Sequence, residues 1–463
     1  MKKSWYLLAP LVFLLVLTAA CTTSGTGGAV SFAEAHDAFE TTLATLSSDE
    51  DEVPVPPEGV FDLVYYESKV GDLAAYVSSD PADGALHPLV IWVVGGWGNG
   101  IDEFPWAYAE WDNDQTGAGF REAGLLMMYP SFRGANGNPG NYETLYGEVD
   151  DIVSAYDYAA SLPYVDPDRI YLAGHSTGGT RVLLASEYTD KFRAVFSFGP
   201  VDEIQYHNTS QFTFDTSNQE EYRLRSPIYW LSDVTSPTFV IEGEGGNGAR
   251  VKAMAEKSTN ENLHFYVIDG ADHFDPLAPV TRLLAQKILA DTGESVTITL
   301  TDEEIQEAMA QEPVVSYPVM KPYSNETAGI QLQLPAIWQA KEDSNDYGIY
   351  LTFNSIYSDD NFWDMSDLFV DIYIMEEPLT LEEYMQIYSL NGIGYQSTTT
   401  EINGQTAFFI EGTDYDNGYV FYHQIVVFQP DNRLIELWFY TLDEYKAYAL
   451  PLFQQILDSV TIS

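Results

Sequence analysis

The sequence predicts a doubly wound α/β domain with a mostly parallel sheet, followed by a smaller α+β domain with an antiparallel sheet. Two observations lead to this prediction. Between residues 60 and 292, short continuous apolar runs alternate with helical segments, as expected when helices cover both faces of a parallel sheet. From residue 330 onward, strand-like segments are linked by hairpin signals such as Asn403-Gly404 and Asp416-Asn417-Gly418. The 463 residues are enough for two domains, each with its own core.

Residues 1–20 have the pattern of an export signal. Lys2 and Lys3 precede an apolar run over residues 5–17, and small residues follow directly before Cys21. The run is too short for a transmembrane helix, and Cys21 is the only cysteine, so no disulfide forms within the chain. The stretch resembles a bacterial lipoprotein signal, which implies cleavage before Cys21, lipid attachment to its thiol and anchoring at the outer face of the cell membrane. The alternative is an ordinary cleaved signal.

Residues 21–59 are predicted to form a tether between the lipid and the first domain. Residues 22–28 are rich in Gly, Ser and Thr, and residues 47–57 combine acidic side chains with prolines. A short helix is predicted between them, within residues 32–46. The segment shows no visible chemistry.

The chain is strongly acidic, with 70 Asp and Glu residues against 20 Lys and Arg and a formal net charge of -50. Nucleic acids are bound through clustered Lys and Arg, so the composition argues against a nucleic acid partner. The negative charge mainly keeps a protein soluble and says little about its chemistry.

Eight strands are predicted in the first domain, over residues 61–66, 73–78, 89–94, 125–129, 170–173, 194–198, 238–241 and 263–268. Ligands of doubly wound sheets gather at the carboxyl ends of the strands. The residues that directly follow each strand are therefore the candidates for a functional site.

The fifth predicted strand enters a Gly-x-Ser-x-Gly motif formed by Gly174, Ser176 and Gly178, and a helix former follows. In such a strand–turn–helix unit the serine occupies a strained position above the sheet, where its hydroxyl is exposed as a nucleophile. The Thr177 amide at the helix N-terminus would face negative charge that forms beside the serine. The alternative is a glycine-rich turn without chemistry.

The third predicted strand is followed by a glycine-rich loop over residues 95–100. Its backbone amides, at Gly96 or Trp97, are candidates for a second oxyanion donor beside Thr177. The alternative is a flexible loop with a packed tryptophan. Arg133, in the loop after the fourth strand, is predicted to brace that loop rather than to bind a substrate.

A serine nucleophile needs a base and an acid that orients it. Of the seven histidines, His273 follows the last predicted strand and fits the chain order serine, acid, histidine, whereas His175 lies inside the turn and points elsewhere. The acid is expected about three residues after Gly243, where Gly246 stands. Glu242 and Glu244 are therefore the candidates, with Glu242 preferred marginally and Asp202 as an outsider.

Several motifs together resemble the catalytic domain of prolyl oligopeptidase-like α/β-hydrolases over about residues 89–289. They are Ser131-Phe132-Arg133-Gly134, Gly147-Glu148-Val149-Asp150-Asp151, Val165-Asp166-Pro167-Asp168-Arg169-Ile170 and the serine turn. The resemblance implies Ser176 as the nucleophile and His273 as the base. Val94 stands where an oxyanion-donating tyrosine or a histidine is common, which leaves esterase activity open beside peptidase activity.

Residues 293–313 are predicted to be a linker with a short helix that Thr301 and Glu304 cap. In the following domain, residues 314–463, strands are predicted over 330–334, 348–353 and 369–375, and helices over 380–388 and 442–457. The motifs at 334–338, 380–384, 402–404 and 453–459 resemble the PsbP-like and LpqN-like domain family. This resemblance implies a binding or assembly module of unknown ligand, without catalytic residues.

No metal or other cofactor is predicted. Residues 112–117 begin like a calcium loop, but Ala123 stands where the twelfth position needs a glutamate, so a plain turn is favoured. No cluster of Cys and His suggests zinc.

The sequence therefore predicts a lipid-anchored, extracytoplasmic serine hydrolase that cleaves small peptide or ester substrates through an acyl-enzyme. The alternative is a catalytically inert surface lipoprotein that uses the same scaffold and the accessory domain for binding.

Overall fold

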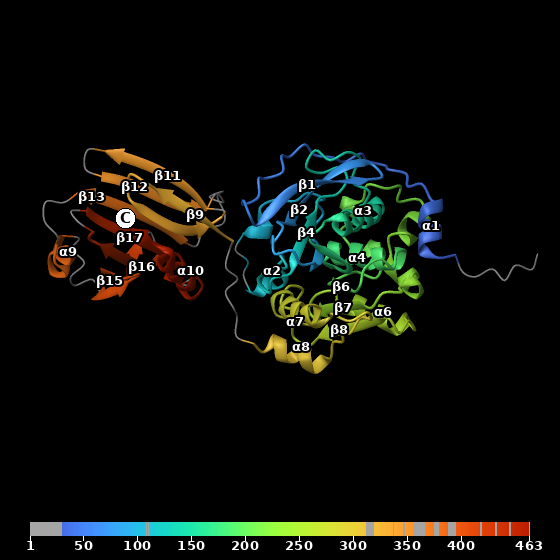
Figure 1. The fold of residues 1–463 in the computed structure, drawn as a ribbon. Coiled ribbons are helices and arrows are strands. Elements are labelled where there is room, and N and C mark those ends of the chain that lie inside the picture. The colour runs from blue at the N-terminus through green and yellow to red at the C-terminus, as the bar shows by residue number, and fades with distance from the viewer. Residues whose placement is uncertain are drawn as a thin grey trace, which may run out of the picture.

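The computed structural model describes residues 30–107, 109, 111–311, 319–336, 338–345, 348–355, 366–374, 379–387, 395–416, 419–430, 433–443 and 446–462. The predicted signal over residues 1–20 and its Cys21 lie outside this range. Figure 1 shows an α/β body and a second body made mainly of antiparallel strands. Within the described part of the chain, every helix is too short or too polar to cross a lipid bilayer.

The first body is built on an eight-stranded sheet with the order β1-β2-β4-β3-β5-β6-β7-β8. Strands β3 to β8 run parallel, and β2 pairs antiparallel with both β1 and β4. The bounds are β1 (Phe61–Ser68), β2 (Gly71–Ser78), β3 (His87–Val93), β4 (Leu126–Pro130), β5 (Val165–His175), β6 (Val195–Phe198), β7 (Thr238–Gly243) and β8 (Leu263–Ile268). This order is that of the α/β-hydrolase fold, and the predicted fold class is confirmed.

Helices cover both faces of this sheet (Figure 1). The helices of this body are α1 (Phe32–Ala38), α2 (Ala118–Glu122), α3 (Gly147–Ser161), α4 (Thr177–Tyr188), α5 (Gln219–Arg223), α6 (Gly248–Lys257), α7 (Leu277–Ala290) and α8 (Asp302–Met309). Single 3₁₀ turns lie at Phe104–Trp106, Trp111–Asn113, Ile204–Tyr206, Thr209–Gln211, Pro227–Tyr229 and Leu231–Asp233. Successive strand residues point to opposite faces, so Leu172 belongs to the same buried cluster as Ile152 of α3, while Tyr171 belongs to the cluster that holds Leu284 of α7.

The described part of the predicted tether, residues 30–59, packs onto the first body, so the prediction of a tether is wrong for these residues. Phe32 on α1 is fully buried, with its ring 5.2 Å from that of Trp230. Backbone hydrogen bonds hold the acidic part of the segment, from Asp49 N to Gly134 O at 2.9 Å and from Tyr142 N to Ser47 O at 2.9 Å. The packing could not be predicted from composition, because the segment is mostly polar and only a few apolar side chains hold it to the body.

The predicted linker also belongs to the first body over its described part. Leu300 and Ile305 are buried in the same core as α7, and Lys287 pairs with Glu304 at 2.7 Å. The predicted capping box is confirmed, since the Thr301 hydroxyl accepts from Glu304 N while the Glu304 carboxylate accepts from Thr301 N. The α/β body therefore extends to about residue 309.

The second body holds two antiparallel sheets (Figure 1). One has the order β18-β10-β9, and the other β11-β12-β13-β17-β16-β15-β14. The bounds are β9 (Met320–Asn325), β10 (Ile330–Pro335), β11 (Trp338–Asn345), β12 (Gly348–Ser355), β13 (Ser366–Ile374), β14 (Gln396–Ile402), β15 (Gln405–Asp416), β16 (Tyr419–Phe428), β17 (Arg433–Leu442), β18 (Thr461–Ile462), α9 (Leu381–Ile387) and α10 (Lys446–Ser459). The predicted class of this domain is confirmed.

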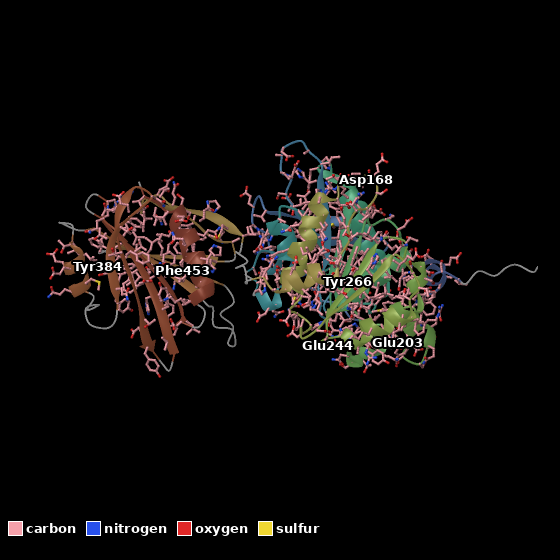
Figure 2. All side chains as sticks on the ribbon, turned by 90° about the horizontal axis from the view of Figure 1, so that it is seen from below. Asp168, Glu203, Glu244, Tyr266, Tyr384 and Phe453 are labelled. Atoms are coloured by element: carbon pink, nitrogen blue, oxygen red, sulfur yellow. The ribbon has the colours of Figure 1, made fainter. Side chains whose placement is uncertain are left out.

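In the second body, some helices and strands begin or end at other residues than predicted. The closing helix begins at Lys446 and not at Leu442, because β17 runs through Leu442 to pair with Phe421. The predicted turn at Asn403-Gly404 joins β14 to β15, and both residues have positive φ, 51° and 78°. Phe453 of α10 packs on Phe439 of β17 with ring centroids 4.6 Å apart (Phe453 is labelled in Figure 2).

Glu187 on α4 is buried with no hydrogen-bond partner for either carboxylate oxygen among the described residues. Burial, and secondarily the charge of Asp233, raise the pKa of Glu187 well above its usual 4.5. A raised acid pKa stabilises the folded state only at low pH, and this contribution is lost as pH rises through the folded pKa, at about 1.4 kcal/mol per pKa unit. We therefore expect Glu187→Met to become progressively more stable than wild type between pH 5 and pH 8 in urea unfolding.

The matched control is Glu256→Met on the exposed face of α6. It should show no such dependence on pH. A stability difference between Glu187→Met and wild type that is the same at both pH values would contradict a neutral buried carboxyl at position 187.

Candidate active site

Ser176 occupies the sharp turn between β5 and α4. Its backbone has φ 59° and ψ -117°, a conformation that L-residues rarely adopt, and its amide donates to Phe198 O at 2.8 Å. The flanking glycines are required by close backbone contact, because a Cβ at Gly174 would lie 2.8 Å from Val93 O and one at Gly178 only 2.2 Å from it. The strain holds the serine at the carboxyl edge of the sheet.

His273 and Glu242 form a hydrogen-bonded pair. His273 lies in the loop after β8, and its Nδ1 is 2.8 Å from Oε1 of Glu242 at the end of β7. A carboxylate only accepts, so Nδ1 carries the hydrogen and Nε2 is left with a lone pair that can take a proton. The Glu242 side chain is 1% exposed and that of His273 21%.

The pair lies beside the serine turn. A Cβ built at Gly199, one residue past β6, would lie 2.5 Å from His273 Cε1 and 2.7 Å from Glu242 Oε2, and β6 also carries Phe198, whose carbonyl binds Ser176 N. The described Ser176 and His273 side chains share no hydrogen bond in this structure. In serine hydrolases this bond is often loose until substrate is bound.

The structure separates the three candidate acids. Glu244 is exposed at the surface, where it faces Lys252 at 3.4 Å (Figure 2). Asp202 is buried but accepts from the neighbouring Glu203 amide at 3.0 Å. Of the three, Glu242 contacts His273, and its Oε1 also accepts from Asn247 N at 2.5 Å.

The missing side chain at Gly246 explains how Glu242, four positions before the expected place of the acid, can reach His273. A Cβ at Gly246 would lie 1.9 Å from Glu242 Oε1 and 2.9 Å from His273 Cα. The carboxylate of Glu242 therefore occupies the space that a side chain at residue 246 would enter.

We expect Gly246→Ala to displace the Glu242 carboxylate and to lower kcat by about 10-fold to 1,000-fold, since misplaced catalytic groups carry penalties of this size. Gly245→Ala is the matched control, because its Cβ would come no closer than 3.3 Å, to Ala271 O. Steady-state kinetics of both variants against wild type checks this. Equal activity of the two variants would show that the space beside Glu242 is not critical.

The three predicted oxyanion residues lie on two neighbouring segments. Thr177 is the first residue of α4, and its hydroxyl donates to the carbonyl of Gly96 in the loop after β3. A Cβ at Gly95 would lie 3.1 Å from Ser176 Cβ, so this loop runs directly beside the serine. The Trp97 ring packs on His207 at 5.2 Å and on Phe212 at 6.3 Å, which gives it a packing role as well.

His175, which sequence reasoning set aside, lies next to the catalytic candidates. Its ring is 4.5 Å from that of His273, and its Nε2 is 3.2 Å from His273 O, where it donates. Burial, and secondarily His273, lower the pKa of His175 to about 3. A neutral His175 therefore holds the His273 loop, a role that its place directly before the serine could have suggested.

Arg133 braces its loop as predicted. Its guanidinium binds both Asp151 oxygens, at 2.9 and 2.8 Å, and Glu143 at 2.9 Å. Within residues 112–117, the Asp114 carboxylate accepts from the backbone amide and the hydroxyl of Thr116.

Part of the first body is similar to a known protein family. Residues 113–251 match the prolyl oligopeptidase family. The matched segment contains Ser176 and Glu242 and ends before His273.

Two curated relatives of the prolyl oligopeptidase-like segment come from Bacillus subtilis (strain 168). The uncharacterized peptidase YtmA is 26% identical over 137 residues, which are 27% of this chain and 53% of YtmA. The uncharacterized peptidase YuxL is 28% identical over 139 residues, which are 26% of this chain and 21% of YuxL. The chain thus spans about half of the first relative and a fifth of the second.

Solved structures are similar at low identity. A puromycin-hydrolyzing peptidase of Mycobacterium tuberculosis is 20% identical, with a TM-score of 0.42 over 51% of this chain and 40% of that one. A hyperthermophilic esterase of Pyrobaculum calidifontis is 15% identical, with a TM-score of 0.37 over 51% of this chain and 86% of that one. The family match and the curated relatives support a hydrolase.

A cavity of about 350 Å³ adjoins the loop after β3 that carries Trp97. It is lined by residues of four segments, among them Ser47, Asp49, Trp97, Asn99, Tyr142 and Phe212. The N-terminal segment, the loops after β3 and β4, and the residues around the 3₁₀ turn at Thr209–Gln211 therefore enclose one space.

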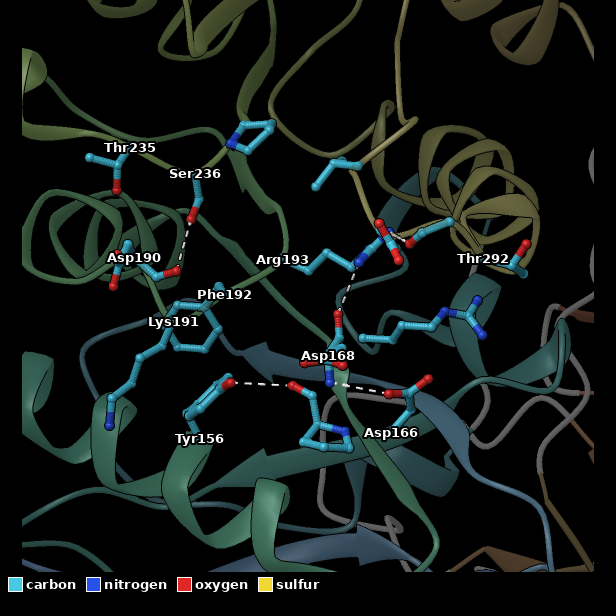
Figure 3. A pocket seen from close by; sticks show the side chains of 16 residues that line it. Tyr156, Asp166, Asp168, Asp190, Lys191, Phe192, Arg193, Thr235, Ser236 and Thr292 are labelled. Atoms are coloured by element: carbon cyan, nitrogen blue, oxygen red, sulfur yellow. Dashed lines mark hydrogen bonds between the residues drawn. The ribbon is translucent and has the colours of Figure 1, made fainter.

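A second cavity, of about 740 Å³, lies at the opposite edge of the sheet (Figure 3). Its walls include Asp166 at the start of β5, Arg193 before β6 and Ser236 before β7. Arg193 donates to Asp168 O at 3.2 Å and binds Asp291 at 2.6 Å. Parallel strands begin here, whereas Ser176 follows the end of β5, so this cavity is separate from the candidate active site.

Proposed function

We propose that this hydrolase is a serine peptidase that works through an acyl-enzyme, with Ser176 as nucleophile, His273 as base and Glu242 as the orienting acid. The observation that carries the proposal is the buried Glu242–His273 hydrogen bond of 2.8 Å beside the strained serine turn. A buried carboxylate fixes the imidazole tautomer that a general base needs. Glu244 and Asp202 have no part in this arrangement.

In the first step, Ser176 Oγ attacks the substrate carbonyl carbon and its proton moves to His273 Nε2. Glu242 stabilises the imidazolium that forms. The new C–O bond gives a tetrahedral intermediate, which collapses as His273 passes the proton to the leaving nitrogen and the C–N bond breaks. Water, activated by the same imidazole, then releases the acyl group and restores Ser176.

The oxyanion of the intermediate is held by the amides of Thr177 and of the Gly96–Trp97 segment. The contact between the Thr177 hydroxyl and Gly96 O fixes these two segments to each other. Backbone donors of this kind contribute about 3–4 kcal/mol each to transition-state stabilisation. The cavity beside Trp97 would receive the substrate side chain.

Ester substrates are the second candidate. Val94, half-buried at the end of β3, offers neither a hydroxyl nor an imidazole to the oxyanion. Stabilisation would then rest on backbone amides, and esters need less of it because their leaving groups depart more readily than amines.

We also propose that the enzyme is exported and lipid-anchored through Cys21 at the outer face of the bacterial membrane, as the leader sequence supports. The second body would act as a PsbP-like or LpqN-like binding module beside the catalytic domain. Its described residues form antiparallel sheets with α10 packed on them.

A fluorophosphonate probe tests the catalytic proposal directly, because it reacts covalently with activated serines. Wild type should be labelled, Ser176→Ala should be silent, and a panel of aminoacyl amides and acyl esters should then show which bond is cleaved. Silence of the folded wild type would overturn the proposal and favour an inert binding protein.

A further inference from the structure

A group of three potential metal ligands lies on the N-terminal segment and α3, outside the proposed active site. The ligand atoms of His36, Asp37 and Asp150 all lie within 4.8 Å of one another. His36 and Asp37 belong to α1, and Asp150 lies in the first turn of α3. No metal site was expected here from the sequence, because Asp150 is far from His36 and Asp37 in the chain and the three residues form no spacing motif.

His36 presents an unpartnered nitrogen to this group. The residue is 3% exposed, its ring stacks on Tyr146 at 4.2 Å, and its Nε2 is 3.2 Å from Tyr146 O, to which it donates. The lone pair is therefore on Nδ1, which is buried and has no hydrogen-bond partner among the described residues. A histidine whose other nitrogen donates to a backbone carbonyl is the usual arrangement of a metal ligand.

The spacing suits a cation better than a hydrogen bond. Nδ1 of His36 lies 3.7 Å from Oδ1 of Asp37, which is too long for a hydrogen bond. Two ligand atoms at about 2.1 Å from a tetrahedral zinc ion are about 3.4 Å apart. A small contraction would bring these atoms to that separation.

Each of the two carboxylates accepts a hydrogen bond on one oxygen, and an ionised carboxylate oxygen keeps a second lone pair that a metal ion can use. Asp37 Oδ1 accepts from the Tyr188 hydroxyl at 2.8 Å, and Asp150 Oδ1 accepts from Lys69 Nζ at 2.8 Å. Lys69 also lies 3.9 Å from Asp37, and its side chain is 60% exposed. The Lys69 ammonium therefore compensates the negative charge of the two carboxylates. It can move out into water when a metal ion binds in its place.

We propose that His36, Asp37 and Asp150 bind a divalent transition-metal ion of the zinc class, with water in the remaining position. One imidazole and two carboxylates are a ligand set that zinc accepts. The ion would tie α1 to α3 and thereby fasten the N-terminal segment to the α/β body. The proposal is independent of the catalytic one.

The test uses the full chain after chelator treatment and dialysis, titrated with Zn²⁺ by calorimetry and thermal unfolding. We expect one site per chain and a rise in Tm of about 5 °C at saturating zinc. Co²⁺ should give visible absorption typical of a site with a nitrogen ligand. Asp37→Asn and Asp150→Asn should each weaken binding at least 10-fold, and Lys69→Ala should tighten it.

His87→Gln is the matched control, because His87 pairs with Asp83 at 3.0 Å on the surface and should leave zinc binding unchanged. If Asp150→Asn fails to fold, Asp37→Asn alone tests the proposal. The Asp37 side chain is 55% exposed, so its substitution should not prevent folding. Absence of a site in wild type, or equal zinc affinity of Asp37→Asn and wild type, would overturn the proposal and assign the cluster to Lys69 alone.

Discussion

Ser176→Ala is expected to lower kcat by at least about 10⁴-fold on any substrate that wild type cleaves, with the fold retained. The hydroxyl is the atom that forms the covalent bond, and no neighbouring group replaces it. Alanine keeps the Cβ that the turn already accommodates at φ 59°, so no new backbone strain arises. Steady-state kinetics checks the rate, and circular dichroism checks that the fold survives.

Ser186→Ala is the control for this loss. Ser186 lies on the same helix and is buried, but its hydroxyl only bonds Leu183 O within that helix, at 2.7 Å. Its removal should leave kcat within about 2-fold of wild type, because it touches no reacting group. Wild-type rates in Ser176→Ala would place the nucleophile elsewhere.

Glu242→Gln is expected to lower kcat by about 10³-fold to 10⁴-fold. The glutamine amide can donate to His273 Nδ1, which then loses its hydrogen, and the proton moves to Nε2, where the base needs its lone pair. Glu244→Gln, two residues further along the chain, is the matched control. Because Glu244 is exposed and faces Lys252, this substitution should leave kcat nearly unchanged. Equal losses in the two variants would contradict the assignment of the acid.

A double replacement tests the same geometry by rescue. Glu242→Ala vacates the space that a Cβ at Gly246 would enter, 1.9 Å from the present Oε1 position. Glu242→Ala combined with Gly246→Asp should therefore recover at least 10-fold of the activity that Glu242→Ala loses. Failure of the pair to recover activity would show that the backbone at residue 246 directs its side chain away from His273.

The parts of the molecule that local pattern determines were predictable. The apolar runs that became β3 to β7 are buried on both faces, so continuous hydrophobicity identified them, whereas β8 at the edge of the sheet is only partly buried. The serine turn was predictable because Gly174 and Gly178 are needed by close backbone contacts. Asn403-Gly404 formed the expected hairpin because both positions require positive φ.

The parts that depend on contacts between distant segments were not predictable. The choice between Glu242 and Glu244 depends on which side chain enters the space beside His273. The packing of Phe32 against Trp230 cannot be read from a polar segment, and neither can the grouping of His36 with Asp150. β9 and β11 escaped prediction because Pro322 and the charged run in β11 are unusual in strands.

The docking of residues 30–59 changes how far the protein can stand from a bilayer. If Cys21 carries a lipid, only nine peptide units separate its Cα atom from that of Val30, the first residue that the structure describes. A chain of that length spans at most roughly 30 Å when fully stretched. The α/β body would then stay close to the lipid head groups. Its substrates would have to reach it through the water layer next to the membrane surface.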